Sequence, residues 1–286
     1  MTRVVLVHGI AQQYKGAHTL LDDWYPALSD GVALAGGRLA RDDVSMAFYG
    51  DLFRPAGHRG SGVVDLDAAD VEEGLERDLL LQWWEAAARE ETQVTGPDTV
   101  VRLRTPDLVQ RALNALSHSS FFAGLSERLM IHSARQVRRY FTEPELRALI
   151  QQRLSQTLGA RTDVVVAHSL GSVIAYEVLC AQPELRDLTL VTLGSPLAVR
   201  GLILDRLIPP PTDGHARWPT PVKRWTNIAD RGDPVALAKK LAPSFGTRVT
   251  DQLVHNGARA HDVRPYLTAR QTGQAVADGL GMSAPR

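Results

Sequence analysis

Ser169 stands at a sharp change of sequence character, in the stretch VVVAHSLGSVIA that covers residues 164–175. The β-branched residues before it predict a buried strand, and the small residues after it predict a helix. A serine hydroxyl is a useful nucleophile only where a base can reach it and backbone N–H groups can receive the oxyanion. Small residues at Ala167 and Gly171 let the strand and the helix pass closely enough for such a turn. We therefore predict a nucleophile at Ser169, the alternative being an ordinary turn with an exposed serine.

A nucleophilic serine also needs a base and a carboxylate to orient that base, and the C-terminal third of the chain offers two candidates for each. Asp230 and Asp233 follow a strand-like run, VKRWTNI, at residues 222–228. Either carboxylate could orient an imidazole, although Asp230 lies closer to the strand and could instead close an Asx turn. His255 ends a further predicted strand, whereas His261 precedes a predicted helix on a loop that can carry its ring over the sheet edge.

These motifs resemble those of the α/β-hydrolase superfamily, in particular its lipases and esterases. The stretch around Ser169 is similar to their G-x-S-x-G nucleophile elbow, with Ala167 in the place of the first glycine. The turn Asp-Pro-Val-Ala that begins at Asp233 is similar to the turn that carries the acid in many lipases. The segment after His261 is similar to their closing H-x-x-Y segment, with a longer gap to the tyrosine. The resemblance covers residues 4–266 apart from one insertion.

The resemblance implies a role for each of these residues. The superfamily order of serine, acid and histidine implies a catalytic triad of Ser169, Asp233 and His261. It also implies an oxyanion hole made by two backbone N–H groups, those of Leu170 and Ile10. Ile10 follows the His-Gly turn after the first strand, and the histidine of that turn then organises the turn rather than acting as the base.

The implied activity is hydrolysis of a carboxylic ester through an acyl-enzyme intermediate, with a small-molecule acyl ester as the substrate and with neither a cofactor nor a metal ion. The same machinery can act on thioesters, amides, peptides or lactones, so these substrates remain alternatives. A non-catalytic binding module that keeps the pocket is an alternative of another class, and the intact order of the three residue types argues against it. The acyl length, the leaving group and the oligomeric state do not follow from the sequence.

The composition is that of a compact globular chain. It has 286 residues, of which 44% are hydrophobic, and 32 basic and 32 acidic residues leave no net charge. A neutral chain gives no signal for a polyanionic partner, so we predict no nucleic-acid binding. Neither a signal peptide nor an apolar run of membrane-spanning length is present in the sequence, which predicts a cytoplasmic protein without a membrane span. Cys180 is the only cysteine, so no disulfide can form within the chain.

Strand-like and helix-like segments alternate along the chain, which predicts an α/β protein with a mostly parallel central sheet flanked by helices. As the resemblance implies, we expect one α/β-hydrolase domain over residues 1–286 that lacks the first strands of that fold. The expected strands cover residues 3–7, 44–49, 163–168, 188–193, 222–228 and 248–254. The expected helices outside the insertion cover residues 19–35, 143–158, the stretch after Ser169 and the stretch from residue 263 onward.

An insertion at residues 54–142 separates the second strand from the nucleophile strand, and we expect it to form a helical cap or lid. Its predicted helices cover residues 69–91, 106–117 and 120–141. Apolar stripes on these helices, one of which includes Phe121 and Phe122, either line an acyl pocket or only pack together. The arginines at positions 135, 138 and 139 are predicted to form a solvated face, the alternative being a site for a lipid head group or an acidic substrate.

Overall fold

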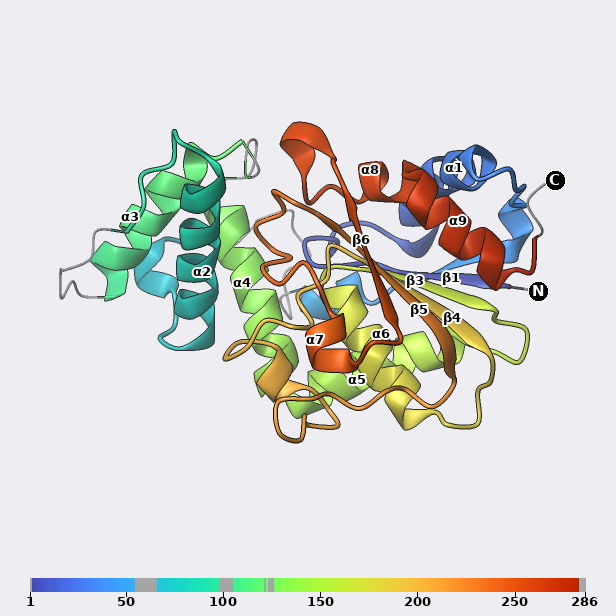
Figure 1. Cartoon of the computed structure of the whole chain (residues 1–286). Coiled ribbons are helices and arrows are strands. Elements are labelled where there is room, and N and C mark those ends of the chain that lie inside the picture. Colours follow the sequence, from blue (N-terminus) through green and yellow to red (C-terminus); the bar gives the residue numbers. More distant parts are fainter. Residues whose placement is uncertain (1, 55–65, 98–104, 121, 123–125, 283–286) are drawn as a thin grey trace.

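The computed structural model describes residues 2–54, 66–97, 105–120, 122 and 126–282, and it shows an α/β architecture (Figure 1). Within these ranges a six-stranded sheet forms the centre, with every strand parallel to its neighbours in the order β2-β1-β3-β4-β5-β6. The predicted α/β class and parallel sheet are therefore confirmed. The strands are β1 (Val4–Val7), β2 (Val44–Ala47), β3 (Val164–His168), β4 (Leu188–Leu193), β5 (Val222–Asp230) and β6 (Val249–Val254).

Interior strands of this sheet are apolar on both sides because helices cover both faces. Val4 of β1 lies beside Val44 on one neighbouring strand and Val164 on the other. Alternate side chains of a strand point to opposite faces. Val5 accordingly packs into one hydrophobic cluster, whereas Val4 and Leu6 pack into the other. The continuous apolar run that begins the sequence is thus explained by its interior position.

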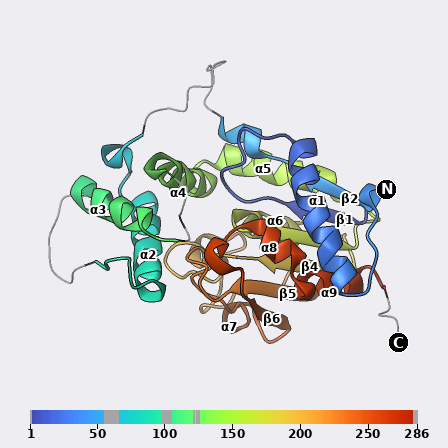
Figure 2. The ribbon, with the colours of Figure 1, turned by 90° about the horizontal axis from the view of Figure 1, so that it is seen from above.

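The helices form two layers around the sheet and a separate group at one end. They are α1 (Ala17–Leu34), α2 (Leu75–Glu90), α3 (Thr105–Ser117), α4 (Glu127–Thr142), α5 (Pro144–Thr157), α6 (Leu170–Ala181), α7 (Ala242–Phe245), α8 (Val263–Thr268) and α9 (Arg270–Gly279). Helices α1, α8 and α9 lie over one face of the sheet, and α5 and α6 lie over the other (Figures 1 and 2). No helix in the described ranges is both long and apolar enough to cross a membrane.

Helices α2, α3 and α4 lie beyond the ends of the strands, on the left of Figure 1. Their buried side chains continue the hydrophobic cluster that fills the α5 and α6 side of the sheet. Two of these helices begin later than predicted. Gly74, with φ of 90°, separates α2 from a short 3-10 helix at Ala68–Asp70. Helix α4 begins after Ser126, whose hydroxyl accepts a hydrogen bond from the Leu129 N–H and so caps the helix.

The prediction of a solvated arginine face on α4 was wrong, because the side chains of all three arginines are mostly buried and pair with carboxylates. Arg138 and Arg135 contact the carboxylate of Glu76 on α2 at 2.7 Å and 3.3 Å, and the Glu76 side chain is fully buried. A buried carboxylate must be compensated by charge or hydrogen bonds, and α4 supplies both arginines for it. The third arginine, Arg139, pairs with Glu143 one turn further along the chain.

Candidate active site

Ser169 occupies the turn between β3 and α6, as predicted. Its backbone has φ of 54° and ψ of −131°, a strained conformation for a residue with a side chain. Hydrogen bonds on both sides hold this turn. The Ser169 N–H donates to the carbonyl oxygen of Leu193 at 3.0 Å, and the Ser172 hydroxyl donates to the Ser169 carbonyl oxygen at 2.6 Å. The strain is thus maintained by the sheet on one side and by the first turn of α6 on the other.

Two glycines let the end of β1 approach this turn. A Cβ atom at Gly171 would lie 2.3 Å from the His8 carbonyl oxygen, and one at Gly9 would lie 2.7 Å from the Cβ of Ser169. Real Cβ atoms do not come this close to other heavy atoms, so neither position accepts a larger residue without a backbone shift. The small residue predicted to be necessary at Gly171 is therefore required by its contact with β1.

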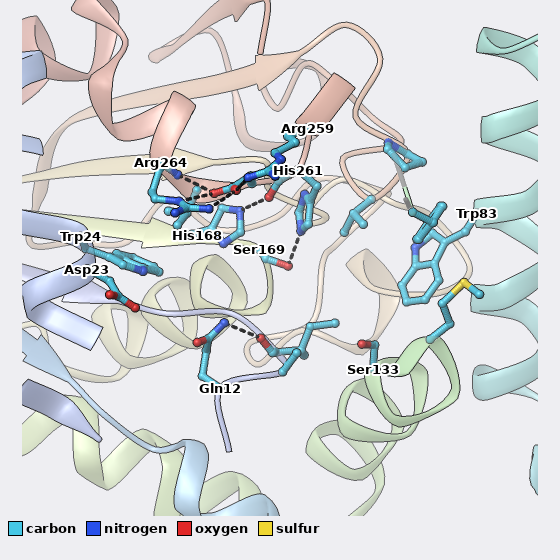
Figure 3. Close-up of a pocket in the computed structure, with 18 of the residues that line it drawn as sticks. Gln12, Asp23, Trp24, Trp83, Ser133, His168, Ser169, Arg259, His261 and Arg264 are labelled. Carbon is cyan, nitrogen blue, oxygen red and sulfur yellow. Dashed lines mark hydrogen bonds and ion pairs between the residues drawn. The ribbon is translucent and has the colours of Figure 1, made fainter. Parts of the chain in front are cut away.

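Ser169, His261 and Asp233 form one hydrogen-bonded chain, of which Figure 3 shows the contact between Ser169 and His261. The distance from Ser169 Oγ to His261 Nε2 is 3.0 Å, and that from His261 Nδ1 to Asp233 Oδ2 is 2.8 Å. In the neutral imidazole that carries its proton on Nδ1, the ring donates to Asp233 and accepts from the serine hydroxyl. The arrangement can therefore take the serine proton on Nε2 and stabilise the resulting imidazolium with the carboxylate.

Asp233 is fully buried, and its carboxylate is held in place from several directions. Its Oδ1 accepts hydrogen bonds from the N–H groups of Val235 and Ala236, and its Oδ2 accepts one from the Tyr266 hydroxyl at 2.8 Å. Burial alone would raise the pKa of this carboxyl, but His261 and the Tyr266 hydroxyl outweigh burial and lower the pKa below its ordinary value. Asp233 therefore stays ionised beside the imidazole.

The other two candidates do not join this chain. Asp230 is buried and accepts hydrogen bonds from the Gly232 N–H, at 2.7 Å, and from the Asn256 N–H. The bond to Gly232 closes the Asx turn that was the alternative role predicted for Asp230. Asp230 therefore holds the two loops that carry Asp233 and His261. His255, at the end of β6, is exposed, and the His261 ring is the one that reaches Ser169.

The two predicted oxyanion donors are Leu170, which follows the serine in the chain, and Ile10, which lines the same cavity as the serine. Leu170 is the first residue of α6, so its N–H has no acceptor within the helix. Ile10 follows Gly9, whose α-carbon lies against Ser169, and Ile10 lines the cavity at this point. His8 is buried and bonds the Gly9 carbonyl oxygen at 2.7 Å, and burial lowers its pKa to about 4. A neutral His8 therefore organises this turn, as predicted, and is not the base.

His168, directly before the nucleophile, also touches the base, which the sequence did not indicate. Its Nε2 lies 3.1 Å from the His261 carbonyl oxygen, and the two ring centroids are 4.7 Å apart. Burial, helped by the nearby His261, lowers the pKa of His168 to about 3, so the ring is neutral and donates this hydrogen bond. The Trp24 ring on α1 lies nearly perpendicular to the His168 ring, with the two centroids 6.1 Å apart. His168 thereby fixes the loop that carries His261.

A cavity of about 610 Å³ opens over Ser169. Figure 3 shows Asp23, Trp24 and Arg264 on one side of the serine and Trp83 and Ser133 on the other. The described residues bring no three His, Cys, Asp or Glu side chains together in a way that could hold a metal ion.

Fold and site together define an α/β protein with a serine, a histidine and an aspartate linked beneath a cavity at the carboxyl ends of parallel strands. A scan against models of protein families finds no match for the chain. A search of curated proteins finds no relative of it either. What the site does must accordingly be inferred from its own geometry.

Proposed function

We propose that this protein is a serine hydrolase that cleaves a carboxylic ester through an acyl-enzyme intermediate. The observation that carries the proposal is the hydrogen-bonded chain from Asp233 through His261 to Ser169, with the serine at a strained strand-to-helix turn. A structural serine does not need a strained backbone, a hydrogen-bonded imidazole partner and an open cavity together. These features are what a serine nucleophile requires.

The reaction assigns one role to each group. Ser169 Oγ attacks the ester carbonyl while its proton passes to His261 Nε2, and Asp233 stabilises the imidazolium. The N–H groups of Ile10 and Leu170 receive the developing oxyanion. His261 then returns the proton to the oxygen of the departing alcohol, which leaves an acyl group on Ser169. A water molecule, activated by the same imidazole, releases the acid and restores the serine.

We further propose that the architecture is an α/β-hydrolase fold without its first strands, in which residues 54–142 form the cap. The nucleophile follows an interior strand, β3, and the acid and base follow β5 and β6. Trp83 of α2 and Met130 of α4 line the cavity over Ser169, which supports a role for this group of helices as a cover. Cytoplasmic location remains a prediction from the sequence.

Labelling with a fluorophosphonate probe tests the proposal, because such a probe reacts covalently only with an activated serine. We expect one adduct per chain, located at Ser169 by mass spectrometry of the digested protein. The same protein denatured by heat before labelling is the negative control. A Ser169→Ala variant should lose the adduct and lower turnover of an activated ester on the order of 10⁶-fold, with the fold intact.

A folded protein that takes up no probe would refute the proposal and favour a binding module. A Ser169→Ala variant that keeps more than a tenth of the activity would refute the assignment of Ser169 as the nucleophile. Substrate class is a separate measurement. An ester panel with matched thioester and peptide controls, all carrying the same acyl group, should show the highest kcat/KM for the ester.

A further inference from the structure

A side chain from a helix far along the chain holds the turn that carries Ile10. Gln136 of α4 accepts a hydrogen bond from the Ala11 N–H on its Oε1, at 3.0 Å. Its Nε2 donates to Oε1 of Gln13 at 2.9 Å. Both glutamines are buried, so water competes little for these hydrogen bonds. Helix α4 therefore contacts the segment directly after Ile10 at two points.

The two partners of Gln136 fix the orientation of its amide. A backbone N–H only donates, so the atom of Gln136 that faces Ala11 must be the oxygen. The nitrogen then faces Gln13, whose side-chain oxygen accepts its hydrogen bond. A glutamine supplies one acceptor and one donor in this arrangement, whereas a carboxylate would only accept and an aliphatic side chain would do neither.

Ala11 adopts a backbone conformation that needs such support. Its φ is 63°, which is unfavourable for a residue with a Cβ atom. Residues keep a conformation of this kind only where the surrounding contacts hold them in it. The hydrogen bond from the Ala11 N–H to Gln136 is such a contact. Without it the segment can relax toward negative φ values, which rotates the peptide group next to Ile10.

Two peptide groups meet at Ile10, and each is anchored by a side chain. The first contains the Ile10 N–H, and its Gly9 carbonyl oxygen bonds His8 Nδ1 at 2.7 Å. The second contains the Ala11 N–H, which Gln136 binds. Because a peptide group is planar, anchoring the second one limits rotation at the Ile10 α-carbon. The direction of the Ile10 N–H therefore depends on both anchors.

We propose that Gln136 is a positioning residue of the oxyanion hole, which holds Ala11 and thereby aims the Ile10 N–H at the oxygen of the tetrahedral intermediate. This inference depends on the proposed serine hydrolase function. An oxyanion donor stabilises the transition state only if it is in place before the negative charge develops. Helix α4 thus contributes to the chemical step through Gln136, in addition to lining the cavity through Met130.

A trifluoromethyl ketone labelled with ¹³C at its carbonyl carbon tests this role. The Ser169 oxygen bonds to that carbon, its proton passes to His261, and the ketone oxygen becomes a hemiketal oxygen in the place of the oxyanion. The ¹³C resonance moves when this oxygen ionises, and donors aimed at it lower the pH at which it does so. In Gln136→Met we expect the midpoint of this titration to lie about one pH unit higher than in the parent. We expect kcat for an activated ester to fall about tenfold, less than for loss of a donor, and KM to change little.

Gln151→Met on α5 is the matched control. This substitution also removes two hydrogen bonds of a glutamine, to Glu177 at 2.8 Å and to the Tyr140 hydroxyl at 3.3 Å, and neither partner belongs to the turn at Ile10. It should leave the midpoint unchanged. Gln13→Met removes only the acceptor of the Gln136 Nε2, so it should move the midpoint in the same direction by less. It also provides the answer if Gln136→Met does not fold.

The outcomes separate this inference from the proposed function. If the hemiketal carbon titrates at the same pH in the parent and in both variants of the Gln13 and Gln136 pair, the positioning role is wrong while the serine hydrolase assignment stands. An equal change of the midpoint in Gln151→Met would also overturn it, because any loss of buried hydrogen bonds would then suffice. If the parent forms no hemiketal and Ser169 takes up no fluorophosphonate, the proposed function itself fails.

Discussion

Tyr266 connects the carboxylate of the triad to the rest of the protein, whereas the sequence predicted only its position in the closing segment. Its hydroxyl donates to Asp233 Oδ2 and accepts a hydrogen bond from the Asp230 N–H at 2.7 Å. The oxygen that orients His261 is thus itself oriented by a buried phenol. Tyr266 acts on the reaction through Asp233, as a positioning residue.

We predict that Tyr266→Phe lowers kcat about tenfold and changes KM little, because one hydrogen bond to a charged group is lost. The Tyr266 hydroxyl helps to keep the pKa of Asp233 low. Without it that pKa rises, and activity should be lost at a higher pH on the acid side of the profile. Steady-state kinetics across pH measure both effects. Tyr25→Phe, which loses a hydrogen bond to the Leu39 carbonyl oxygen instead, is the control; an unchanged pH profile for Tyr266→Phe would contradict the positioning role.

Because two histidines are buried, we predict that the folded protein loses stability in acid. Burial lowers the pKa of His8 to about 4 and, with the nearby His261, that of His168 to about 3, whereas an unfolded chain has histidine pKa values near 6.5. The unfolded state therefore binds protons first as the pH falls below about 6.5. The stabilisation is fully present above that pH and decreases until the pH reaches the folded pKa values. The loss by pH 4 is on the order of 3 kcal/mol for each histidine.

Urea unfolding between pH 7 and pH 4.5 measures this dependence. The variant His8→Gln should show a slope of unfolding free energy against pH that is smaller by about one proton over this range. The same slope in the variant and in the parent would show that His8 is not held neutral by its burial.

At the scale of elements, the turn after β4 leaves no room for a side chain beside the triad. Gly194 has φ of 53°, and a Cβ atom there would lie 2.8 Å from Asp233 Oδ2 and 3.1 Å from His261 Nδ1. The end of β4 therefore sets the space in which these two side chains meet. Gly201 also has a positive φ, of 75°, but its Cβ would meet nothing within 4 Å.

We predict that Gly194→Ala lowers kcat at least 100-fold, because the added methyl group displaces the hydrogen bond between Asp233 and His261. Misplacement of catalytic groups by about 1 Å can cost this much. Gly201→Ala is the matched control, since it carries a similar backbone penalty of roughly 1 kcal/mol without the clash. Equal activity losses in the two variants, measured beside their thermal stabilities, would mean that backbone strain and not the triad contact is responsible.

At the scale of the whole molecule, helices α2 to α4 contribute side chains both to the wall of the cavity and to the hydrophobic cluster beside the sheet. Trp83 lines the cavity over Ser169, and its ring centroid lies 5.9 Å from that of Phe122. The apolar stripes of these helices therefore supply both packing and cavity surface. Phe121 lies outside the described residues, as do residues 55–65 and 98–104 of the expected cap.

We predict that kcat/KM rises severalfold for each pair of methylene groups added to the acyl chain until the part of the cavity near Trp83 and Met130 is filled, since each buried methylene contributes roughly 0.8 kcal/mol. Phe122→Trp should move the optimum to shorter chains. Phe141→Trp, on α4 but packed against Tyr140, is the control. Hydrolysis of a series of nitrophenyl esters gives the profile, and a flat profile in all three proteins would show that the helices only pack.

The sequence by itself determined the local elements and the residue types of the site. The apolar run before Ser169 and the small residues after it specify a strand, a turn and a helix, because these preferences depend on near neighbours in the chain. The same holds for the buried strands β1 and β4. The sequence also placed Asp233 and His261 in loops after strands, but it did not exclude Asp230 as the acid or His255 as the base.

Only the tertiary structure decided which of these side chains meet. Tyr266 contacts Asp233 across 33 positions of the chain, and His168 reaches the His261 carbonyl oxygen across 93. The cavity likewise joins Lys15 and Asp23 from the first helical region to Trp83 and to residues near position 260. Such contacts depend on strand order and helix packing, which leave no local pattern in the sequence. The chemistry of each group is thus encoded locally, whereas its partners and its selectivity arise from the fold.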